Sequence, residues 1–334
     1  MGLTIRDVAR AAGVSPSTVS HALSGKRTVS ATTRARIERV IEELGYRPNQ
    51  VAASMTTGRT LTLGMLVPDI ANPYFGQLVA NVERTAGARG YTVVVGSSEL
   101  DAELEARHVR RLVDRQVDAL VYLGGTDAPN PAVVDAARQR PVVAVDEPFS
   151  WLPESAATIT VDNRVGGMLA AQHLIGLGHE RLAVVAGPAG LPTARDRTAG
   201  FVDAAERAGR EPVVRSADNY TVDAGRRVGA TLLTTDADVT GVFCANDLIA
   251  LGVMQVAAEL GRRVPSDLAL VGFDDMFVST LVTPALTTVR QPLDRIGREA
   301  AELAIALAAG ESGLTMRRVL PVDLVVRGST AART

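Results

Sequence analysis

From Leu61 onward, short apolar runs alternate with longer segments in which apolar positions recur every three to four residues. The apolar runs predict strands at 61–67, 91–97, 119–123, 142–146, 181–187, 241–245 and 268–273. The longer segments predict helices at 75–89, 101–115, 164–177, 195–208, 246–260 and 292–309. Nearly continuous apolar strands separated by helices are typical of parallel sheets covered on both faces. Because there are too many strands for one lobe, we predict an α/β architecture of two Rossmann-like lobes with a cleft between them.

The first 45 residues show a different pattern, which predicts three short helices. Thr4 and Asp7 resemble a capping box at the start of the first helix. Ser15 can cap the second helix, and Pro16 falls at its first position, where a missing N–H costs nothing. The third helix is predicted within 30–45. Two short helices joined by a glycine-containing turn, with a third to complete the core, predict a small all-α helix-turn-helix head.

Charge divides the chain at about the same place. Residues 1–60 hold nine Lys or Arg and four Asp or Glu, a net charge of +5, so the remainder carries −7 of the overall −2. A small basic head on an acidic body is typical of a nucleic-acid-binding domain attached to a part that need not bind nucleic acid. On charge alone, a solvated charged surface is an equally good explanation.

The second helix of the head carries the candidate DNA contacts. In a helix-turn-helix, the N-terminal residues of this helix enter the major groove. Ser17, Thr18, Ser20 and His21 are not needed for the core and can hydrogen-bond to base edges or phosphates. For Ser20, a solvated position stays open as the alternative. Arg27, in the following loop, can reach either kind of partner.

Composition excludes several classes of protein. The apolar fraction of 46% and charged fraction of 22% are those of an ordinary soluble protein. No apolar run reaches the ~18–20 residues that a membrane span needs, and the N-terminus lacks the layout of a signal peptide, so we expect a cytoplasmic protein without a membrane partner. The single cysteine, Cys244, excludes a disulfide framework and a multi-thiolate metal site, and its apolar neighbours predict a buried strand position. We expect no metal and no cofactor.

The head resembles the lactose-repressor (LacI/GalR) family of transcription regulators. The matching strings are TIRDVARAAGVSPSTVSHALSGKRTVS and ELGYRPNQVAASMTTGRT. The resemblance implies that Ser17, His21 and Arg27 contact bases and that Pro16 occupies a specificity position with only apolar contact to offer. It also implies a hinge helix from Asn49 to about Thr57. The DNA-binding residues predicted in total are Ser15, Pro16, Ser17, Thr18, His21, Arg27, Asn49 and Met55.

The hinge departs from the family pattern. In the family, two hinge helices pair across a dimer, and each inserts an apolar side chain, usually leucine, into the minor groove. Here that position carries Met55, whose flexibility makes the kinking contact less well specified. The neighbouring residues, often basic in the family, are Ala53, Ser54 and Thr56. Nine residues make an isolated helix marginal in water, so we expect order only when the segment is bound or packed against a partner.

The body resembles the periplasmic-binding-protein-like sensor of the same family, so the resemblance covers essentially the whole chain. The matching strings are NPYF, VDNRVGG, HLIGLGH, RTAGF, FCANDLIALGV, VGFDD and PALTTVRQP. Polar and aromatic residues gather where predicted strands end, which is where such sheets bind ligands. The resemblance implies that Phe75 borders the effector and that Arg197 and Asp274 hold its polar groups, with Asn246 on the same wall. Core packing is the alternative for Phe75, and a lobe-closing ion pair is the alternative for Arg197. Tyr74 and Asp146 are weaker candidates.

These observations divide the chain into a helix-turn-helix domain at 1–48, a hinge helix and linker at 49–60 and a two-lobed effector-binding and dimerisation domain at 61–334. The family topology implies three crossings between the lobes, near 160–163, 290 and 321. The N-lobe then holds about 61–160 and 292–320. The C-lobe holds about 163–290 and 322–330.

We therefore expect a transcription regulator, first of all a repressor, that binds a pseudo-palindromic operator as a homodimer under the control of a small molecule. A sugar is the leading effector, with a nucleoside or purine as the alternative. Control by a protein partner stays open, and a solute-binding protein is a more distant possibility. A dinucleotide-dependent enzyme is disfavoured because LGMLVPDIANP stands where G-x-G-x-x-G would follow the first strand. We expect no catalysis.

Overall fold

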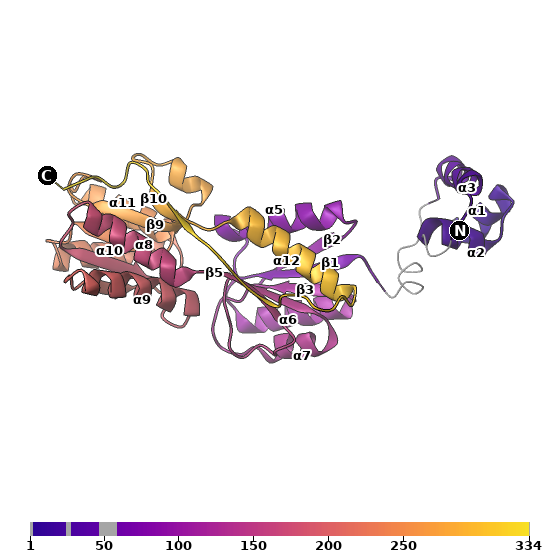
Figure 1. Ribbon diagram of the computed structural model, residues 1–334, viewed down its shortest axis with the longest axis horizontal. Helices are drawn as coiled ribbons and strands as arrows, with labels where there is room; N and C mark the ends of the chain where they lie inside the picture. The colour runs from indigo at the N-terminus through magenta and orange to yellow at the C-terminus, as the bar shows by residue number, and fades with distance from the viewer. Residues whose placement is uncertain (1–2, 25–27, 47–58, 334) are drawn as a thin grey trace. The chain divides into compact units, whose positions relative to one another are not determined.

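The computed structural model describes residues 3–24, 28–46 and 59–333. The chain divides into two compact units, Met1–Thr60 and Leu61–Thr334 (Figure 1). Each unit has its own hydrophobic core and is described separately below. No helix in the described ranges is both long enough and apolar enough to cross a membrane.

The first unit is a bundle of three helices, α1 (Ile5–Ala12), α2 (Pro16–Ser24) and α3 (Ala31–Leu44). The predicted capping box is present, because the Asp7 carboxylate accepts the Thr4 N–H at 2.9 Å. The pKa of Asp7 is lowered, first by the Thr4 hydroxyl and then by the Thr4 N–H. The apolar faces of the helices meet in one small core, which consists of Val8, Ala9, Ala12, Val19, Ala22, Ile37 and Val40.

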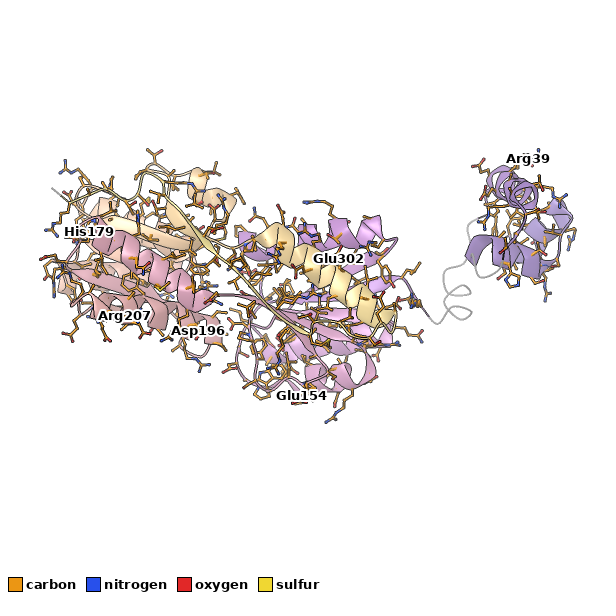
Figure 2. The ribbon with its side chains drawn as sticks, in the orientation of Figure 1. Arg39, Glu154, His179, Asp196, Arg207 and Glu302 are labelled. Atoms are coloured by element: carbon orange, nitrogen blue, oxygen red, sulfur yellow. The ribbon has the colours of Figure 1, made fainter. Side chains whose placement is uncertain are left out.

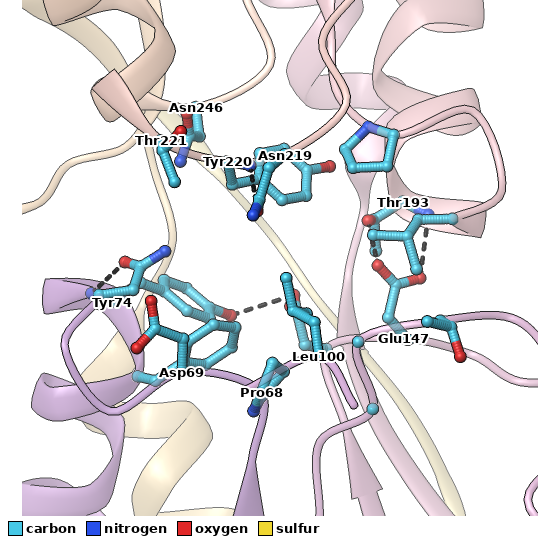
Figure 3. A pocket seen from close by; sticks show the side chains of 18 of the residues that line it. Pro68, Asp69, Tyr74, Leu100, Glu147, Thr193, Asn219, Tyr220, Thr221 and Asn246 are labelled. Carbon is cyan, nitrogen blue, oxygen red and sulfur yellow. Dashed lines mark hydrogen bonds between the residues drawn. The ribbon is translucent and has the colours of Figure 1, made fainter. Parts of the chain in front are cut away.

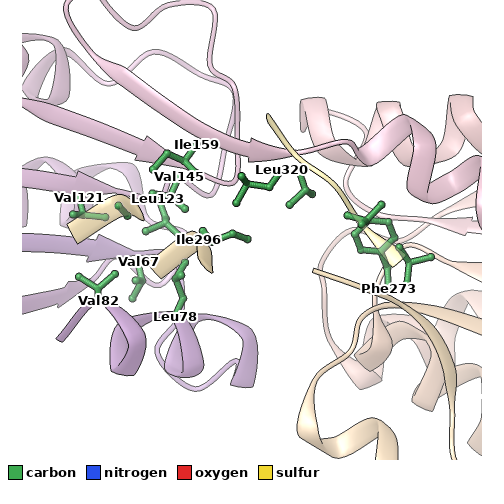
Figure 4. Packing of buried hydrophobic residues seen from close by; sticks show 14 of the residues in the cluster. Val67, Leu78, Val82, Val121, Leu123, Val145, Ile159, Phe273, Ile296 and Leu320 are labelled. Atoms are coloured by element: carbon green, nitrogen blue, oxygen red, sulfur yellow. The ribbon is translucent and has the colours of Figure 1, made fainter. Parts of the chain in front are cut away.

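The N-lobe of the second unit is built on a six-stranded parallel sheet with the order β11-β5-β4-β3-β1-β2. Its strands are β1 (Thr62–Val67), β2 (Thr92–Ser97), β3 (Ala119–Tyr122), β4 (Val142–Val145), β5 (Ala157–Val161) and β11 (Arg317–Leu320). Helices α5 (Pro73–Ala88) and α12 (Leu293–Ala308) pack together on one face, and α6 (Ala102–Asp114) and α7 (Pro131–Gln139) pack together on the other. Figure 4 shows Leu78, Val82 and Ile296 packed near the apolar strand residues.

The C-lobe repeats this plan with the strand order β12-β10-β9-β8-β6-β7. Its strands are β6 (Leu182–Ala186), β7 (Val213–Ser216), β8 (Gly241–Cys244), β9 (Ala269–Asp274), β10 (Thr287–Arg290) and β12 (Asp323–Val325). All neighbours are parallel except β10 and β12, which are antiparallel. Helices α8 (Asn163–Gly176) and α9 (Pro192–Arg207) pack together, as do α10 (Val222–Thr235) and α11 (Asp247–Glu259), and the short helix η1 (Phe277–Thr280) follows β9.

The chain passes between the two lobes three times, from β5 to α8, from β10 to α12 and from β11 to β12. Figure 1 shows these segments running between the two sheets. Charged side chains such as Glu154, Asp196 and Arg207 stand on the outside of the lobes (Figure 2). Cys244 is fully buried in β8, as predicted, and burial raises the pKa of its thiol.

The predicted fold class is confirmed, and each predicted strand and helix of the lobes has a counterpart within a few residues. The strand predictions left out β5, β7, β10, β11 and β12. Strand β7 alternates half-buried and exposed residues, and β11 has one buried residue of four, so neither shows the continuous apolar run of a central strand. These strands owe their place to neighbours that are distant in the sequence.

Candidate functional site

A cavity of about 280 Å³ lies between the two lobes, where strands from both sheets end at their carboxyl termini (Figure 3). In open α/β sheets this is the position at which ligands bind. The cavity is lined by Pro68, Asp69, Asn72, Tyr74, Phe75, Leu100, Gly124, Gly125, Thr126, Asp146, Glu147, Pro188, Leu191, Thr193, Arg197, Asp218, Asn219, Tyr220, Thr221, Asn246 and Asp274.

Arg197 is the buried cation of this cavity, and it is held by protein groups on several sides. Its Nε donates to Asn163 Oδ1 at 2.7 Å, and one terminal nitrogen donates to the Ala245 carbonyl at 2.7 Å. The same nitrogen lies 3.6 Å from Asp274 Oδ1, and the guanidinium carbon lies 3.8 Å from the centre of the Phe273 ring. A planar guanidinium fixed in this way presents its remaining edge in one orientation.

A chain of polar contacts joins the two lobes at the cavity. The Tyr74 hydroxyl, on α5, lies 3.0 Å from Asp146 Oδ1 and 3.3 Å from Gln291 Oε1. The amide nitrogen of Gln291 donates to Asp274 Oδ1 at 2.8 Å. Asp146 and Asp274 both adopt positive φ, 76° and 106°, a conformation that is uncommon for residues other than glycine. Both carboxylates therefore stand at strained strand ends, as residues at functional sites often do.

Burial sets the protonation of these acids. Desolvation raises the pKa of Asp274 to about 7 even though Arg197 and Gln291 oppose the shift. Desolvation raises the pKa of Asp146 as well, against the effect of Arg197. Beside it, desolvation and the Asp146 charge together raise the pKa of Glu147 to about 7. The cavity is thus poised to exchange protons near neutral pH when its charge environment changes.

Glu147 links the lobes directly. It follows β4 of the N-lobe and is buried, and its carboxylate accepts both the backbone N–H and the hydroxyl of Thr193. Thr193 lies in the first turn of α9 in the C-lobe, where backbone N–H groups have no partner within the helix. An anionic side chain at such an end is favoured by the helix dipole as well as by the hydrogen bonds.

Close packing of α8 on α9 positions Arg197 and Thr193. A Cβ atom added at Gly167 would lie 1.9 Å from the Arg197 carbonyl oxygen, and one added at Gly200 would lie 1.9 Å from the Arg164 carbonyl oxygen. The two backbones therefore approach as closely as only glycine allows. The strings VDNRVGG and RTAGF contain these glycines.

The structure brings the six predicted ligand residues, Tyr74, Phe75, Asp146, Arg197, Asn246 and Asp274, to one cavity. Phe75 meets Tyr74 edge to face at 5.1 Å between ring centres. The side chain of Asn246 also caps α11, accepting the Ile249 N–H at 2.8 Å. Trp151 packs against Tyr122 and Phe149 inside the N-lobe, and it is not among the residues that line the cavity.

Sequence reasoning missed several residues of the site, namely Glu147, Thr193, Gln291 and Asn163, and it gave Tyr220 no role. Glu147 directly follows the predicted Asp146 at the end of a strand, so the same topological rule could have included it. The contact of Thr193 with Glu147 depends on how the two lobes close, which no local pattern encodes. Tyr220 lies over Gly187, and its buried hydroxyl has no geometrically good hydrogen-bond partner among the described residues.

In the first unit, the N-terminus of α2 forms a compact polar surface. The Ser15 hydroxyl accepts the Thr18 N–H at 3.1 Å and lies 2.7 Å from the Ser17 hydroxyl. Pro16 and Ser17 are exposed, and His21, one turn further along the helix, is half-buried. The other three predicted DNA contacts, Arg27, Asn49 and Met55, and with them the hinge helix, lie outside the described residues.

Comparison with known proteins identifies the family to which the chain belongs. A family model described as bacterial regulatory proteins, lacI family, matches residues 4–49, and one described as a periplasmic binding protein-like domain matches residues 171–330. The HTH-type transcriptional repressor CytR of Escherichia coli K12 is 33% identical over 332 residues, which is 98% of this chain and 96% of the relative. The chain belongs to the lacI family of bacterial regulatory proteins. It is therefore a transcription regulator, as its resemblance to this family implied.

Solved structures agree with this lacI-family membership over nearly the full length. The lac repressor dimer bound to operator and the anti-inducer ONPF superimposes with a TM-score of 0.87 at 30% identity, covering 99% of this chain and 100% of that one. The transcriptional regulator CelR in complex with cellobiose superimposes with a TM-score of 0.74 at 34% identity, covering 98% and 99%. The descriptions of both structures name a bound small molecule.

Proposed function

We propose that this lacI-family regulator binds a pseudo-palindromic operator as a homodimer and represses transcription, under the control of a small molecule held between the lobes. The observation that carries the proposal is the pairing of two sites in one chain. One is the exposed N-terminus of α2 with Pro16 and Ser17, and the other is the inter-lobe cavity around Arg197 and Asp274. The first suits a DNA groove and the second suits a small polar ligand.

Direct readout of the operator is assigned to α2. Ser17 and His21 project from one side of the helix and carry groups that hydrogen-bond to base edges, while Ser15 and Thr18 suit phosphates. Because each head reads one half-site, two heads related by a two-fold axis require an operator of two inverted half-sites. The lac repressor structure described above is a dimer on operator DNA, which supports the same assembly here. We propose a cytoplasmic location, because that is where the DNA target of a bacterial-type regulator lies.

The effector is assigned to the cavity, with a sugar as the first candidate and a nucleoside or purine as the second. Phe75 and Tyr74 offer aromatic surfaces to an apolar ring face, and Asp146, Asp274 and Arg197 offer acceptors and donors to hydroxyl groups. The cellobiose bound to CelR supports a sugar. At about 280 Å³ the cavity is at the lower end of ligand sites, ~300–1,000 Å³, so it suits a single ring better than a chain of rings.

Control follows from the contacts between the lobes. Ligand that bridges Asp146 on the N-lobe and Arg197 on the C-lobe favours one angle between them, and in a dimer that angle decides whether the segments at 49–57 can pair on DNA. The coupling is reciprocal, so operator must change ligand affinity by the same factor as ligand changes operator affinity. We propose that the protein acts by binding rather than by catalysis, and that it needs no cofactor or metal.

Selection of binding sequences from a random double-stranded library by the full-length chain tests this function. Enrichment of one inverted repeat, bound with a mass corresponding to two chains, supports it. A single half-site bound by one chain, or no enrichment above bulk DNA, would contradict it. Control by a protein partner would be favoured if the selected operator responded to a purified partner and to no small molecule.

A further inference from the structure

The charges around the cavity do not balance. Three carboxyl groups, those of Asp146, Glu147 and Asp274, meet at its wall, and two of these residues are nearly inaccessible, Glu147 at 3% and Asp274 at 5% exposure. Among the described lining residues Arg197 is the one with a cationic side chain. The cavity wall therefore carries more acidic than basic side chains. An ionised acid that is buried without a counter-charge is unfavourable.

The Arg197 guanidinium already makes most of its contacts with groups of the protein. Two of its three nitrogens donate to Asn163 and to the Ala245 carbonyl, and the second of these also faces Asp274. The acidic excess therefore falls on Asp146 and Glu147. Asp146 is only partly buried and faces the cavity, where its one described hydrogen-bond partner is the neutral hydroxyl of Tyr74; the Arg197 charge acts on it without a direct ion pair among the described contacts.

Of the remaining acids, Asp69 lines the cavity and accepts the Ala71 N–H at 2.9 Å, and two others pair with arginines outside the cavity. Asp218 pairs with Arg227 at 2.7 Å at the outer edge. Asp127, near that edge, lies 3.6 Å from Arg195. Neither arginine is among the residues that line the cavity, so neither offers a free cation to a ligand. The buried Tyr220 hydroxyl, on the C-lobe side of the cavity, adds a neutral donor and acceptor without a geometrically good partner among the described residues.

We propose that the effector is a single polyhydroxylated ring bearing a protonated amino group, such as an amino sugar, and that phosphorylated and carboxylated sugars are excluded. This inference rests on the proposed function of the cavity as the effector site. The ammonium group binds at Asp146 and offsets the acidic excess, while the hydroxyl groups bond to Arg197, Asp274 and Tyr220. A phosphate or carboxylate in the same place meets buried acids of its own sign, with no uncommitted cation to hold it.

Proton release distinguishes the charged ligand from a neutral one. Burial raises the pKa of Glu147 to about 7 and raises the pKa of Asp146 as well, so an incoming ammonium group shifts both carboxyl groups toward the ionised form. Binding of an amino sugar at pH 6.5 is therefore accompanied by a net release of protons to the buffer. Binding of the matched neutral sugar releases none.

The test uses the full-length chain and matched sets of sugars. Glucose, galactose and mannose are each compared with their 2-amino and 6-phosphate forms by thermal shift and then by calorimetry in two buffers of different ionisation enthalpy. We expect at least one amino form to bind about tenfold more tightly than its neutral parent and to release protons. We expect no sugar phosphate to stabilise the protein. A phosphate or neutral form as the best ligand, or no response to any member of the panel, would overturn the proposal.

A pair of variants assigns the preference to the cavity. Asp146→Asn keeps the shape and the Tyr74 contact but removes the charge, so the preference for amine over neutral parent should fall to within about threefold. Asp196→Asn removes an exposed acid from α9 and should leave the preference unchanged. Equal effects of both variants would mean that the preference comes from the overall charge of the protein. Operator binding by each variant reports separately on the proposed function.

Discussion

Thr193 of the C-lobe donates its backbone N–H, over 3.2 Å, and its hydroxyl to the Glu147 carboxylate of the N-lobe. This contact joins the two lobes beside the cavity and does not involve Arg197, the cationic side chain of the cavity. It gives the closed form a stabilising interaction of its own, which the ligand does not have to supply. The equilibrium between open and closed lobes, and hence effector affinity, should depend on it.

Removing this contact should weaken effector binding. Glu147→Gln leaves one acceptor and places an amide N–H against the donors of Thr193, and Thr193→Val removes the hydroxyl donor. Each variant should bind effector about tenfold more weakly in calorimetry. Thr193→Ser keeps the hydroxyl and serves as the control, with affinity close to that of the unaltered chain. Equal losses in Thr193→Ser and Thr193→Val would show that the methyl group, not the hydrogen bond, matters.

The raised pKa of Glu147, about 7, predicts a dependence of stability on pH. Above its ordinary value of 4.5 the unfolded chain releases the proton while the folded chain keeps it, so this residue lowers the free energy of unfolding as pH rises toward 7. The loss is on the order of 3 kcal/mol. Glu147→Gln should lose less stability than the unaltered chain between about pH 5 and pH 8 in denaturant titrations. Parallel pH profiles for the two proteins would contradict the assignment.

Much of this architecture could be predicted from the sequence because its signals are local. Central strands such as β3 and β4 are buried on both faces and appear as continuous apolar runs, and the cap at Ser30 and the stop at Gly45 mark the ends of α3. The acids Asp146 and Asp274 lie at the carboxyl ends of strands, where such sheets bind ligands, and this position together with the family resemblance predicted both as site residues.

The remainder depended on how distant segments meet. Gln291 contacts Tyr74 across 217 positions of sequence, and Glu147 contacts Thr193 across 46. No local sequence pattern around either residue of these pairs identifies the residue that it contacts. Strand β12 is antiparallel to β10 and has three residues, so only its place in the finished sheet distinguishes it from a loop. Lobe orientation is a tertiary property, and the contacts that depend on it needed the structure.

The close approach of α8 and α9 predicts a sharp difference between two glycines of one helix. Gly167→Ala forces the α9 backbone away and should lower the free energy of unfolding by ~3 kcal/mol, with loss of effector binding. Gly176→Ala, near the end of the same helix, meets no atom within 4 Å and should be neutral or slightly stabilising. Chemical denaturation of both variants measures the difference. Similar stabilities would mean that the two helices are not packed backbone to backbone.

The surface that we propose for DNA binding, at the N-terminus of α2, has a natural control in α3, whose N-terminus carries a similar group of hydroxyls. Ser17→Ala and His21→Ala should each weaken binding to the selected operator by roughly 1–3 kcal/mol and relax preference at one position of each half-site. Thr32→Ala alters an exposed hydroxyl two residues after the Ser30 cap, the place that Ser17 holds after Ser15, and should change affinity by less than about twofold. Equal losses in all three variants would show that the recognition surface does not lie on α2.

The proposed control of the DNA-binding head by the inter-lobe cavity can be measured by fluorescence anisotropy of the selected operator with and without saturating effector. We expect a shift of about fivefold or more in operator affinity for the unaltered chain. We expect no shift for Arg197→Lys, which cannot reproduce the bonds to Asn163 and Ala245, although that variant still binds operator. An operator affinity that stays the same at saturating effector in the unaltered chain, or an identical shift in Arg197→Lys, would contradict the proposed control.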